Sequence, residues 1–106
     1  MAKFLIEATY NVEGAKGLMK EGGSKRREAA RAAIESVGGR MESFYFAFGG
    51  TDAFVVIDAP DNMSAAAASA AINTSGSVQC RTVVLLTPEE MDEAVKKNVK
   101  YRAPGQ

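Results

Sequence analysis

The sequence predicts one α+β domain spanning residues 1–106, and three observations lead to this prediction. With 106 residues, 46% of them hydrophobic and 25% charged, the chain has the size and composition of a single globular domain. Segments with the two-residue period of strands alternate with segments of helical period, in the order β-α-β-β-α-β, and one more helix follows. Gly, Pro and capping residues mark the boundaries between these segments.

Residues 3–10 form the first predicted strand, because every second side chain, beginning with Phe4 and Ile6, falls on one side of the segment. Residues 11–23 follow with four glycines and no sustained period. We therefore expect the longest loop of the domain there, with at most one helical turn at residues 17–20.

The first long helix is predicted to begin at Ser24 and to end at the pair Gly38 and Gly39. Apolar residues recur at helical spacing between these limits, and the Ser24 side chain can cap the first turn. Arg31 and Glu35 have the i,i+4 spacing of an ion pair. The glycines favour the left-handed conformation that commonly ends a helix.

Two further strands are predicted at residues 40–48 and 53–59. The first alternates between two sets of side chains, and the second is a continuous run of mostly apolar residues. Residues 49–52, Gly-Gly-Thr-Asp, have the composition of a short hairpin turn. The two strands should therefore be antiparallel neighbours.

A second helix and a fourth strand complete the pattern. Pro60 should end the third strand, and either Asp61 or Asn62 can cap an alanine-rich helix that extends to about Ile72. Alanines favour a helix and let it approach its neighbours closely. Residues 77–86 alternate again and are predicted as the fourth strand.

The last helix is predicted to begin after Thr87, where Thr-Pro-Glu-Glu has the pattern of a capping box with Pro at the first helical position. It should extend to about Val99, and residues 100–106 should fray. The complete order is that of a ferredoxin-like domain, in which two helices cover one face of a four-stranded antiparallel sheet.

The second face of this sheet is expected to be too apolar for water. We place in the core a set of strand residues that alternate correctly: Phe4, Ile6, Tyr45, Val55, Ile57 and Val84. The opposite face then presents Leu5, Phe44, Phe46, Phe48, Phe54, Val56, Val83 and Leu85. Such a patch usually marks an interface or a ligand groove. We therefore predict a homodimer or higher oligomer through this face, with a ligand between the last helix and the sheet as the alternative cover.

The charge and composition argue against several functions. Thirteen basic and thirteen acidic residues give no net charge, so no general attraction to nucleic acid or to an anionic membrane is expected. The absence of His removes the commonest general base and the commonest metal ligand. Cys80 is the only cysteine, and we expect it to be a small buried residue rather than a nucleophile. No spacing implies a metal or a cofactor.

The amino-terminal residues are too polar, and their apolar stretch too short, for a signal peptide. The sequence also contains no run of about 18 apolar residues, the length that a helix needs to cross a bilayer. A cytoplasmic location is the resulting expectation.

The candidates for binding a small molecule are Glu7, Tyr10, Tyr45, Asp52 and Arg81. Glu7 and Arg81 lie on strands that should be adjacent, where they can form a salt bridge or hold a polar group. Asp52 follows the hairpin glycines, a place where Asp most often accepts backbone N–H groups. Tyr10 and Tyr45 can donate to an anion, although aromatic residues on strands usually belong to the core.

Ser24, Lys25 and Arg26 form a weaker candidate site, for an anion. Glycines before a helix leave backbone N–H groups free, and basic side chains follow at once. The segment lacks the spacing of a phosphate-binding loop, so a capped and solvated helix start is the competing interpretation.

Several short segments, spread over nearly the whole chain, are characteristic in their sequence: the strand ending in Tyr10, and residues 24–29, 38–45, 49–61, 78–82 and 87–91. Together they resemble the GYD domain family of small bacterial proteins. The family is named for a Gly-Tyr-Asp motif, and here Thr51 stands at the Tyr position, between Gly50 and Asp52. The resemblance implies a dimeric ferredoxin-like fold of the dimeric α/β-barrel type, related in shape to small oxygenases, chlorite-dismutase-like proteins and amino-acid-sensing domains.

Three functions remain open. The first is a homo-oligomeric protein that binds a small molecule in a cleft between sheet and helices, with Glu7, Tyr45, Asp52 and Arg81 as lining. The second is a cofactor-independent oxygenase or isomerase, in which a desolvated Glu7 or Asp52 would move one proton. The third is a purely structural assembly module. A dimer whose interior is filled by side chains would indicate the assembly module, whereas a dimer with a cavity would indicate one of the other two functions. Turnover that depends on pH would then distinguish the enzyme from the binding protein.

Overall fold

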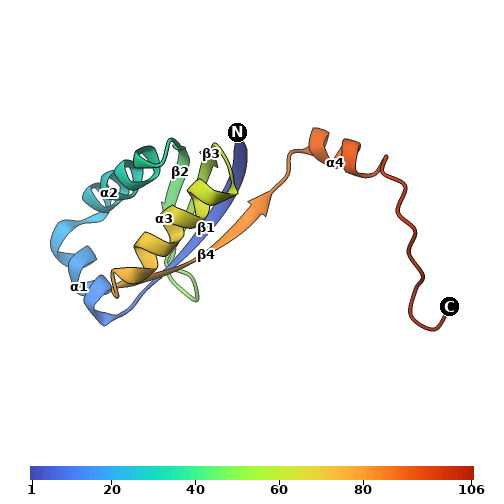
Figure 1. The fold of residues 1–106 in the computed structure, drawn as a ribbon. Coiled ribbons are helices and arrows are strands. Elements are labelled where there is room, and N and C mark those ends of the chain that lie inside the picture. Colours follow the sequence, from blue (N-terminus) through green and yellow to red (C-terminus); the bar gives the residue numbers. More distant parts are fainter.

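Four strands form one antiparallel sheet in the computed structural model, which describes residues 1–106 (Figure 1). The strands are β1 (Ala2–Tyr10), β2 (Arg40–Phe46), β3 (Ala53–Ala59) and β4 (Val78–Leu85), in the spatial order β2-β3-β1-β4. The helices are α1 (Val12–Glu21), α2 (Gly23–Ser36), α3 (Asn62–Thr74) and α4 (Pro88–Ala94). This α+β arrangement confirms the ferredoxin-like prediction.

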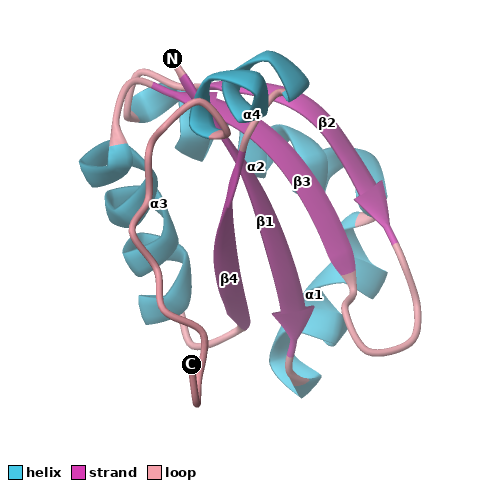
Figure 2. Cartoon of the chain, turned by 90° about the vertical axis from the view of Figure 1, so that its right-hand side faces the viewer, coloured by secondary structure: helices cyan, strands magenta, loops and turns pink.

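The core lies between the sheet and helices α2 and α3, which cover one face of the sheet (Figure 1). It consists of Phe4, Ile6, Ala8, Ile34, Met41, Ala53, Val55, Ile57, Ala59, Ala65, Ala68, Val78 and Cys80. The other side of the sheet, which we call the open face, carries Leu5, Glu7, Tyr45, Phe54, Val56, Val83 and Leu85. No helix packs on it; in Figure 2, α4 lies in front of one end of the sheet, and the chain after α4 passes in front of α3.

A β-bulge reverses the expected faces of strand β2. The register between β2 and β3 shifts between Met41 and Ser43. A shift of one residue exchanges the two faces of a strand, so Phe44 and Phe46 lie on the helix side. The prediction that Tyr45 belongs to the core and that these two phenylalanines belong to the opposite face is therefore wrong. Tyr45 is 72% exposed.

Two further side chains differ from the predicted faces. Val84, expected in the core, is 59% exposed, because strand β4 leaves the helices on its way to α4 (Figure 1). Phe48, expected on the open face, lies in the loop after β2 and is fully exposed.

Helix α1 occupies residues for which the sequence predicted a loop. The Asn11 side chain caps it by accepting a hydrogen bond from the N–H of Gly14 at 2.9 Å, and its amide also donates to the carbonyl of Gly76. A Cβ on Gly14 would lie 2.3 Å from the carbonyl oxygen of Ser77, so only glycine permits this close approach. Cap and close packing outweigh the low helix propensity of the two glycines within α1.

Helix α2 begins at Gly23, and Ser24 does not cap it. Gly22 takes both roles at the junction, as C-cap of α1 and N-cap of α2, with a φ of 87°. This left-handed backbone turns one helix directly into the next and leaves Ser24 inside the first turn. Nor do Arg31 and Glu35 pair, because the guanidinium of Arg31 contacts Glu28 at 3.3 Å instead.

The other helix boundaries confirm the prediction. The backbone at Gly38 has a φ of 82°, and the N–H of Gly39 donates to the carbonyl of Ile34, which closes α2. The Asp61 side chain caps α3 by accepting from the N–H of Ser64 at 2.8 Å.

The C-terminal arm, defined as residues 87–106, extends away from the rest of the domain (Figure 1). Thr87 and Glu90 form the predicted capping box. The helix stops at Ala94 rather than near Val99, since every residue of α4 is exposed and a short helix without packing partners is marginal. None of the helices has the length and apolar composition needed to cross a membrane.

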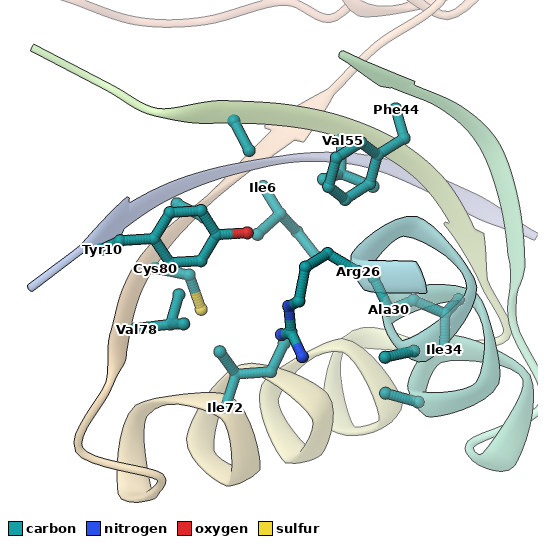
Figure 3. A pocket seen from close by; sticks show the side chains of 14 residues that line it. Ile6, Tyr10, Arg26, Ala30, Ile34, Phe44, Val55, Ile72, Val78 and Cys80 are labelled. Atoms are coloured by element: carbon teal, nitrogen blue, oxygen red, sulfur yellow. The ribbon is translucent and has the colours of Figure 1, made fainter. Parts of the chain in front are cut away.

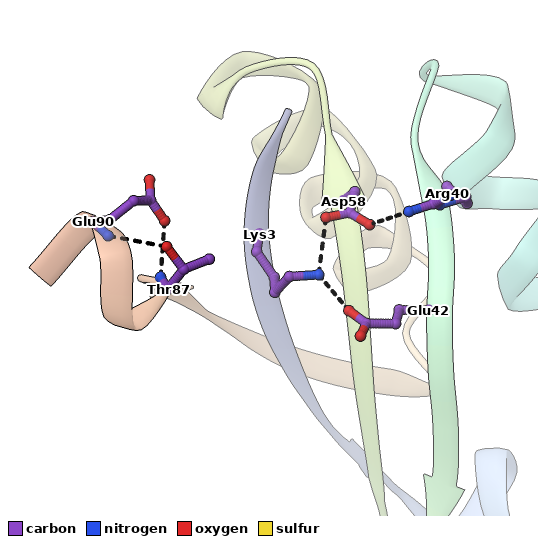
Figure 4. A network of polar contacts seen from close by, with 6 residues as sticks. All are labelled: Lys3, Arg40, Glu42, Asp58, Thr87 and Glu90. Atoms are coloured by element: carbon purple, nitrogen blue, oxygen red, sulfur yellow. Dashed lines mark hydrogen bonds and ion pairs between the residues drawn. The ribbon is translucent and has the colours of Figure 1, made fainter.

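An ion-pair network joins three strands at one end of the open face (Figure 4). Asp58 on β3 accepts from the ammonium of Lys3 on β1 at 3.0 Å and from the guanidinium of Arg40 on β2 at 3.1 Å. Lys3 also contacts the carboxylate of Glu42. The hydrogen bond from Lys3, followed by that from Arg40, holds the pKa of Asp58 below its ordinary value.

Candidate functional site

A cavity of about 130 Å³ lies between the sheet and helices α2 and α3 (Figure 3). We call it the helix–sheet cavity, and its lining is Ile6, Ala8, Tyr10, Arg26, Ala29, Ala30, Ala33, Ile34, Phe44, Ala53, Val55, Ile72, Val78 and Cys80. A cavity of about 150 Å³ with a comparable apolar lining is able to hold a benzene ring. The space therefore suits a small apolar group.

Small residues on helix α2 create this space. Ala29, Ala30 and Ala33 lie on the side of α2 that lines the cavity, and each leaves volume that a larger side chain would fill. Phe44 reaches the cavity from β2 only because the bulge turns it toward the helices. The cavity thus depends on the alanine pattern of one helix and on an irregularity of one strand.

Arg26 is the only charged side chain in the lining. It is the fourth residue of α2, and its side chain is 33% exposed. The side chain extends from α2 toward α3 (Figure 3). Its Nη1 lies 3.6 Å from Oε2 of Glu21, which is an ion pair but longer than a hydrogen bond. The guanidinium therefore keeps donors available for another acceptor.

Tyr10 ends strand β1 and directs its hydroxyl into the cavity (Figure 3). Asp52 fixes its backbone, because Oδ2 of Asp52 accepts from the N–H of Tyr10 at 2.8 Å. The N–H of Asp52 in turn donates to the carbonyl of Ala8 at 2.9 Å. Asp52 thus ties the β2–β3 loop to β1, the backbone role that is usual for Asp in a turn.

Cys80 lies on the cavity wall beside Val78 and is buried, as predicted. Burial raises the pKa of the Cys80 thiol, so the group is a neutral thiol near pH 7. Its Sγ lies 3.7 Å from the carbonyl of Ser69. The residue contributes a small apolar surface to the cavity.

Three of the sequence candidates lie on the open face, away from the cavity. The strand register places Arg81, Glu7, Phe54 and Tyr45 in one row across β4, β1, β3 and β2. Nη2 of Arg81 contacts Oε2 of Glu7 at 3.4 Å, the cross-strand pair expected from the sequence. Thr51 lines the same polar hollow as this pair.

The structure therefore divides the sequence candidates into two groups. Tyr10 lines the helix–sheet cavity, whereas Glu7, Tyr45 and Arg81 do not. Of the three anion candidates, only Arg26 reaches the cavity, while Ser24 and Lys25 are exposed. The sequence signal for the cavity was present in the alanines at 29, 30 and 33, but alanines at helical spacing equally predict an ordinary packed helix.

The chain was also compared with known proteins. The sequence model of the GYD domain family matches residues 4–95. Searches of curated proteins and of solved structures gave no match.

Proposed function

The chain belongs to the GYD domain family, and from this premise we propose that it is a homo-oligomeric protein that binds a small molecule in the cleft between its sheet and its helices. The observation that carries the proposal is the helix–sheet cavity, about 130 Å³ in volume and apolar on nearly all sides. Ligand sites are typically concave and apolar, with few polar groups that fix the orientation of the ligand. Tyr10 and Arg26 supply such groups here.

The lining favours binding over proton transfer. An oxygenase or isomerase without a cofactor needs a group poised to exchange a proton near neutral pH. No carboxylate lines the cavity, and Glu7 and Asp52, the predicted proton carriers, lie outside it. The Cys80 thiol has a raised pKa and stays protonated near neutral pH. Binding is therefore the function that these residues support best.

The open face supports the homo-oligomeric part of the proposal. Val83, Leu5 and Val56 form an apolar row across β4, β1 and β3, next to Phe54. Val83 and Phe54 are 41% and 36% exposed, although both are large apolar residues. A second copy that packs its own sheet on this face would remove both from water.

Charge and the C-terminal arm support the same partner. Acidic and basic side chains are balanced around this face: Glu7, Glu42 and Asp58 against Lys3, Arg40 and Arg81. A balanced face is compatible with a second copy of itself under two-fold symmetry. The C-terminal arm carries the exposed apolar residues Met91 and Val95, which are 49% and 73% exposed. Contact with a second copy would remove them from water.

A cavity-filling substitution tests the binding proposal. Ala30→Leu would occupy the helix–sheet cavity, whereas Ala32→Leu adds the same side chain to the exposed side of α2 and serves as the control. Titration calorimetry with benzyl alcohol should give saturable binding, with a Kd in roughly the micromolar to millimolar range, for the wild type and the control. Ala30→Leu should abolish that binding and keep or raise the melting temperature. Equal binding by both variants, or none by the wild type, would contradict the proposal.

A further inference from the structure

We infer that the ligand of the helix–sheet cavity is a small monocarboxylate, with its apolar body inside the cavity and its carboxylate held by the Arg26 guanidinium and the Tyr10 hydroxyl. This inference rests on the proposed binding function and names the class of ligand. It follows from three features of the site: the single charge in the lining, the place of that charge at the boundary of the cavity, and the weak internal partner that it has.

The first feature is the chemistry of the lining. Arg26 is the one charged side chain among otherwise apolar walls, and the Tyr10 hydroxyl points into the same space (Figure 3). A guanidinium presents paired N–H donors whose geometry matches the two oxygens of a carboxylate. Since both Arg26 and Tyr10 can donate hydrogen bonds, the complementary ligand group is an acceptor with negative charge.

The second feature is the location of these two residues. A polar hollow on the surface, different from the one that Glu7 and Arg81 line, shares Tyr10, Arg26 and Val78 with the helix–sheet cavity. Its other walls are polar or small: Glu13, Gly14, Gly17, Glu21, Ser75 and Ser77. Tyr10 and Arg26 therefore stand at the boundary between an apolar space and a water-exposed one. A molecule with an apolar body and one charged end fits that boundary, because only its body would lose contact with water.

The third feature is the present partner of Arg26. Glu21 ends helix α1, its side chain is 45% exposed, and its carboxylate lies 3.6 Å from the guanidinium. This contact is too long for a hydrogen bond, and exposed ion pairs contribute little to stability. A ligand carboxylate can thus replace Glu21 at small cost. Glu13 and Glu21 also line the hollow, and their charge repels a dianion such as a phosphate monoester more strongly than it repels a monocarboxylate.

Benzoate and benzyl alcohol form a matched pair of probes, since they share a ring and differ in charge. At neutral pH the wild type should bind benzoate about tenfold more tightly than benzyl alcohol, the difference expected for a charge-assisted hydrogen bond. Arg26→Met keeps an apolar stem and should remove this preference. Arg27→Met is the control, because Arg27 pairs with Glu28 on the surface and does not line the cavity.

Glu21→Gln gives a second readout that a structural role for Arg26 would not produce. If Glu21 competes for the guanidinium, this variant should bind benzoate several-fold more tightly, by about the strength of one exposed ion pair, with no change for benzyl alcohol. Titration calorimetry measures both affinities, and circular dichroism shows whether each variant is folded.

The outcomes separate this inference from the proposed function. If benzyl alcohol binds as tightly as benzoate in the wild type, or if Arg26→Met keeps the preference for benzoate, the carboxylate inference is overturned while cavity binding stands. If neither probe binds the wild type, the proposed function fails as well. Tighter benzoate binding in Glu21→Gln together with lost preference in Arg26→Met supports the inference.

Discussion

At the scale of single residues, Asp58 shows how one buried carboxylate holds three strands together. It is the one charged residue in the buried set, and its two oxygens accept from Lys3 on β1 and from Arg40 on β2. These hydrogen bonds lower the pKa of Asp58. A folded-state pKa below the unfolded value means that the carboxylate stabilises the fold above about pH 4, and that this stabilisation is lost as the pH falls through the folded pKa.

The substitution Asp58→Asn should therefore remove a pH-dependent part of the stability. At pH 7 we expect a loss of about 1 to 2 kcal/mol in the free energy of unfolding, because the negative charge is removed and the Asn amide has one acceptor oxygen for the two charged donors. The difference from the wild type should shrink as the pH falls below about 4 and the wild-type carboxylate becomes protonated. Urea unfolding at a series of pH values measures it, with Asp92→Asn on the exposed α4 as control. A difference that stays constant across this range would contradict the account.

Individual residues also show where prediction from the sequence ends. The pairing of Glu7 with Arg81 could be predicted, because both strands alternate without interruption and the parity of each position follows from its neighbours. The face of Tyr45 could not be predicted in the same way. One bulge, between Met41 and Ser43, moves every later residue of β2 to the opposite face of the sheet. No residue type in that segment indicates a bulge.

At the scale of elements, helix α1 depends on contacts that are remote in sequence. Asn11 links the start of the helix to Gly76, and Gly14 fits against Ser77. A local pattern with two internal glycines predicts a loop, because the compensating partners lie far along the chain, just before β4. The other strands and helices have their signals in adjacent residues, such as Asp61 before α3, and these elements could be predicted.

The cap of α1 is therefore expected to be essential for its local stability. Asn11→Ala removes the hydrogen bond to Gly14 and the contact with Gly76, and should cost about 1 kcal/mol. Hydrogen exchange of the α1 amides should become faster, while exchange in α3 stays unchanged. Asn62→Ala is a suitable control, since α3 is capped by Asp61. Unchanged exchange in α1 would show that the cap does not hold the helix.

At the scale of the whole molecule, the open face predicts self-association. Val83→Glu places a charge in the apolar row next to Leu5, and burying that charge would be costly. The wild type should sediment as a dimer or higher oligomer, and the variant as a monomer. Ala66→Glu adds the same charge on the exposed side of α3 and should leave the assembly intact. A monomeric wild type, or an intact Val83→Glu oligomer, would contradict this part of the account.

The order of the four strands and of helices α2, α3 and α4 could be predicted from the sequence, whereas helix α1 and the helix–sheet cavity could not. Strand and helix periods are local properties, and they lead to the ferredoxin-like arrangement. The cavity exists only where α2, the bulged β2 and the end of β1 meet, so it brings together Ala30, Phe44 and Tyr10 from separate elements. Packing of this kind is set by the volumes of facing side chains, which a single pattern does not contain.

The measurement that tests the central claim most directly is a methyl NMR titration of the wild-type protein with benzyl alcohol. Ligand in the helix–sheet cavity should shift the methyl signals of its aliphatic lining: Ile6, Ile34, Val55, Ile72 and Val78. The methyl signals of the open face should not shift, namely those of Leu5, Val56, Val83 and Leu85. Shifts confined to the open face, with the cavity methyls unmoved, would contradict a binding site between the sheet and the helices.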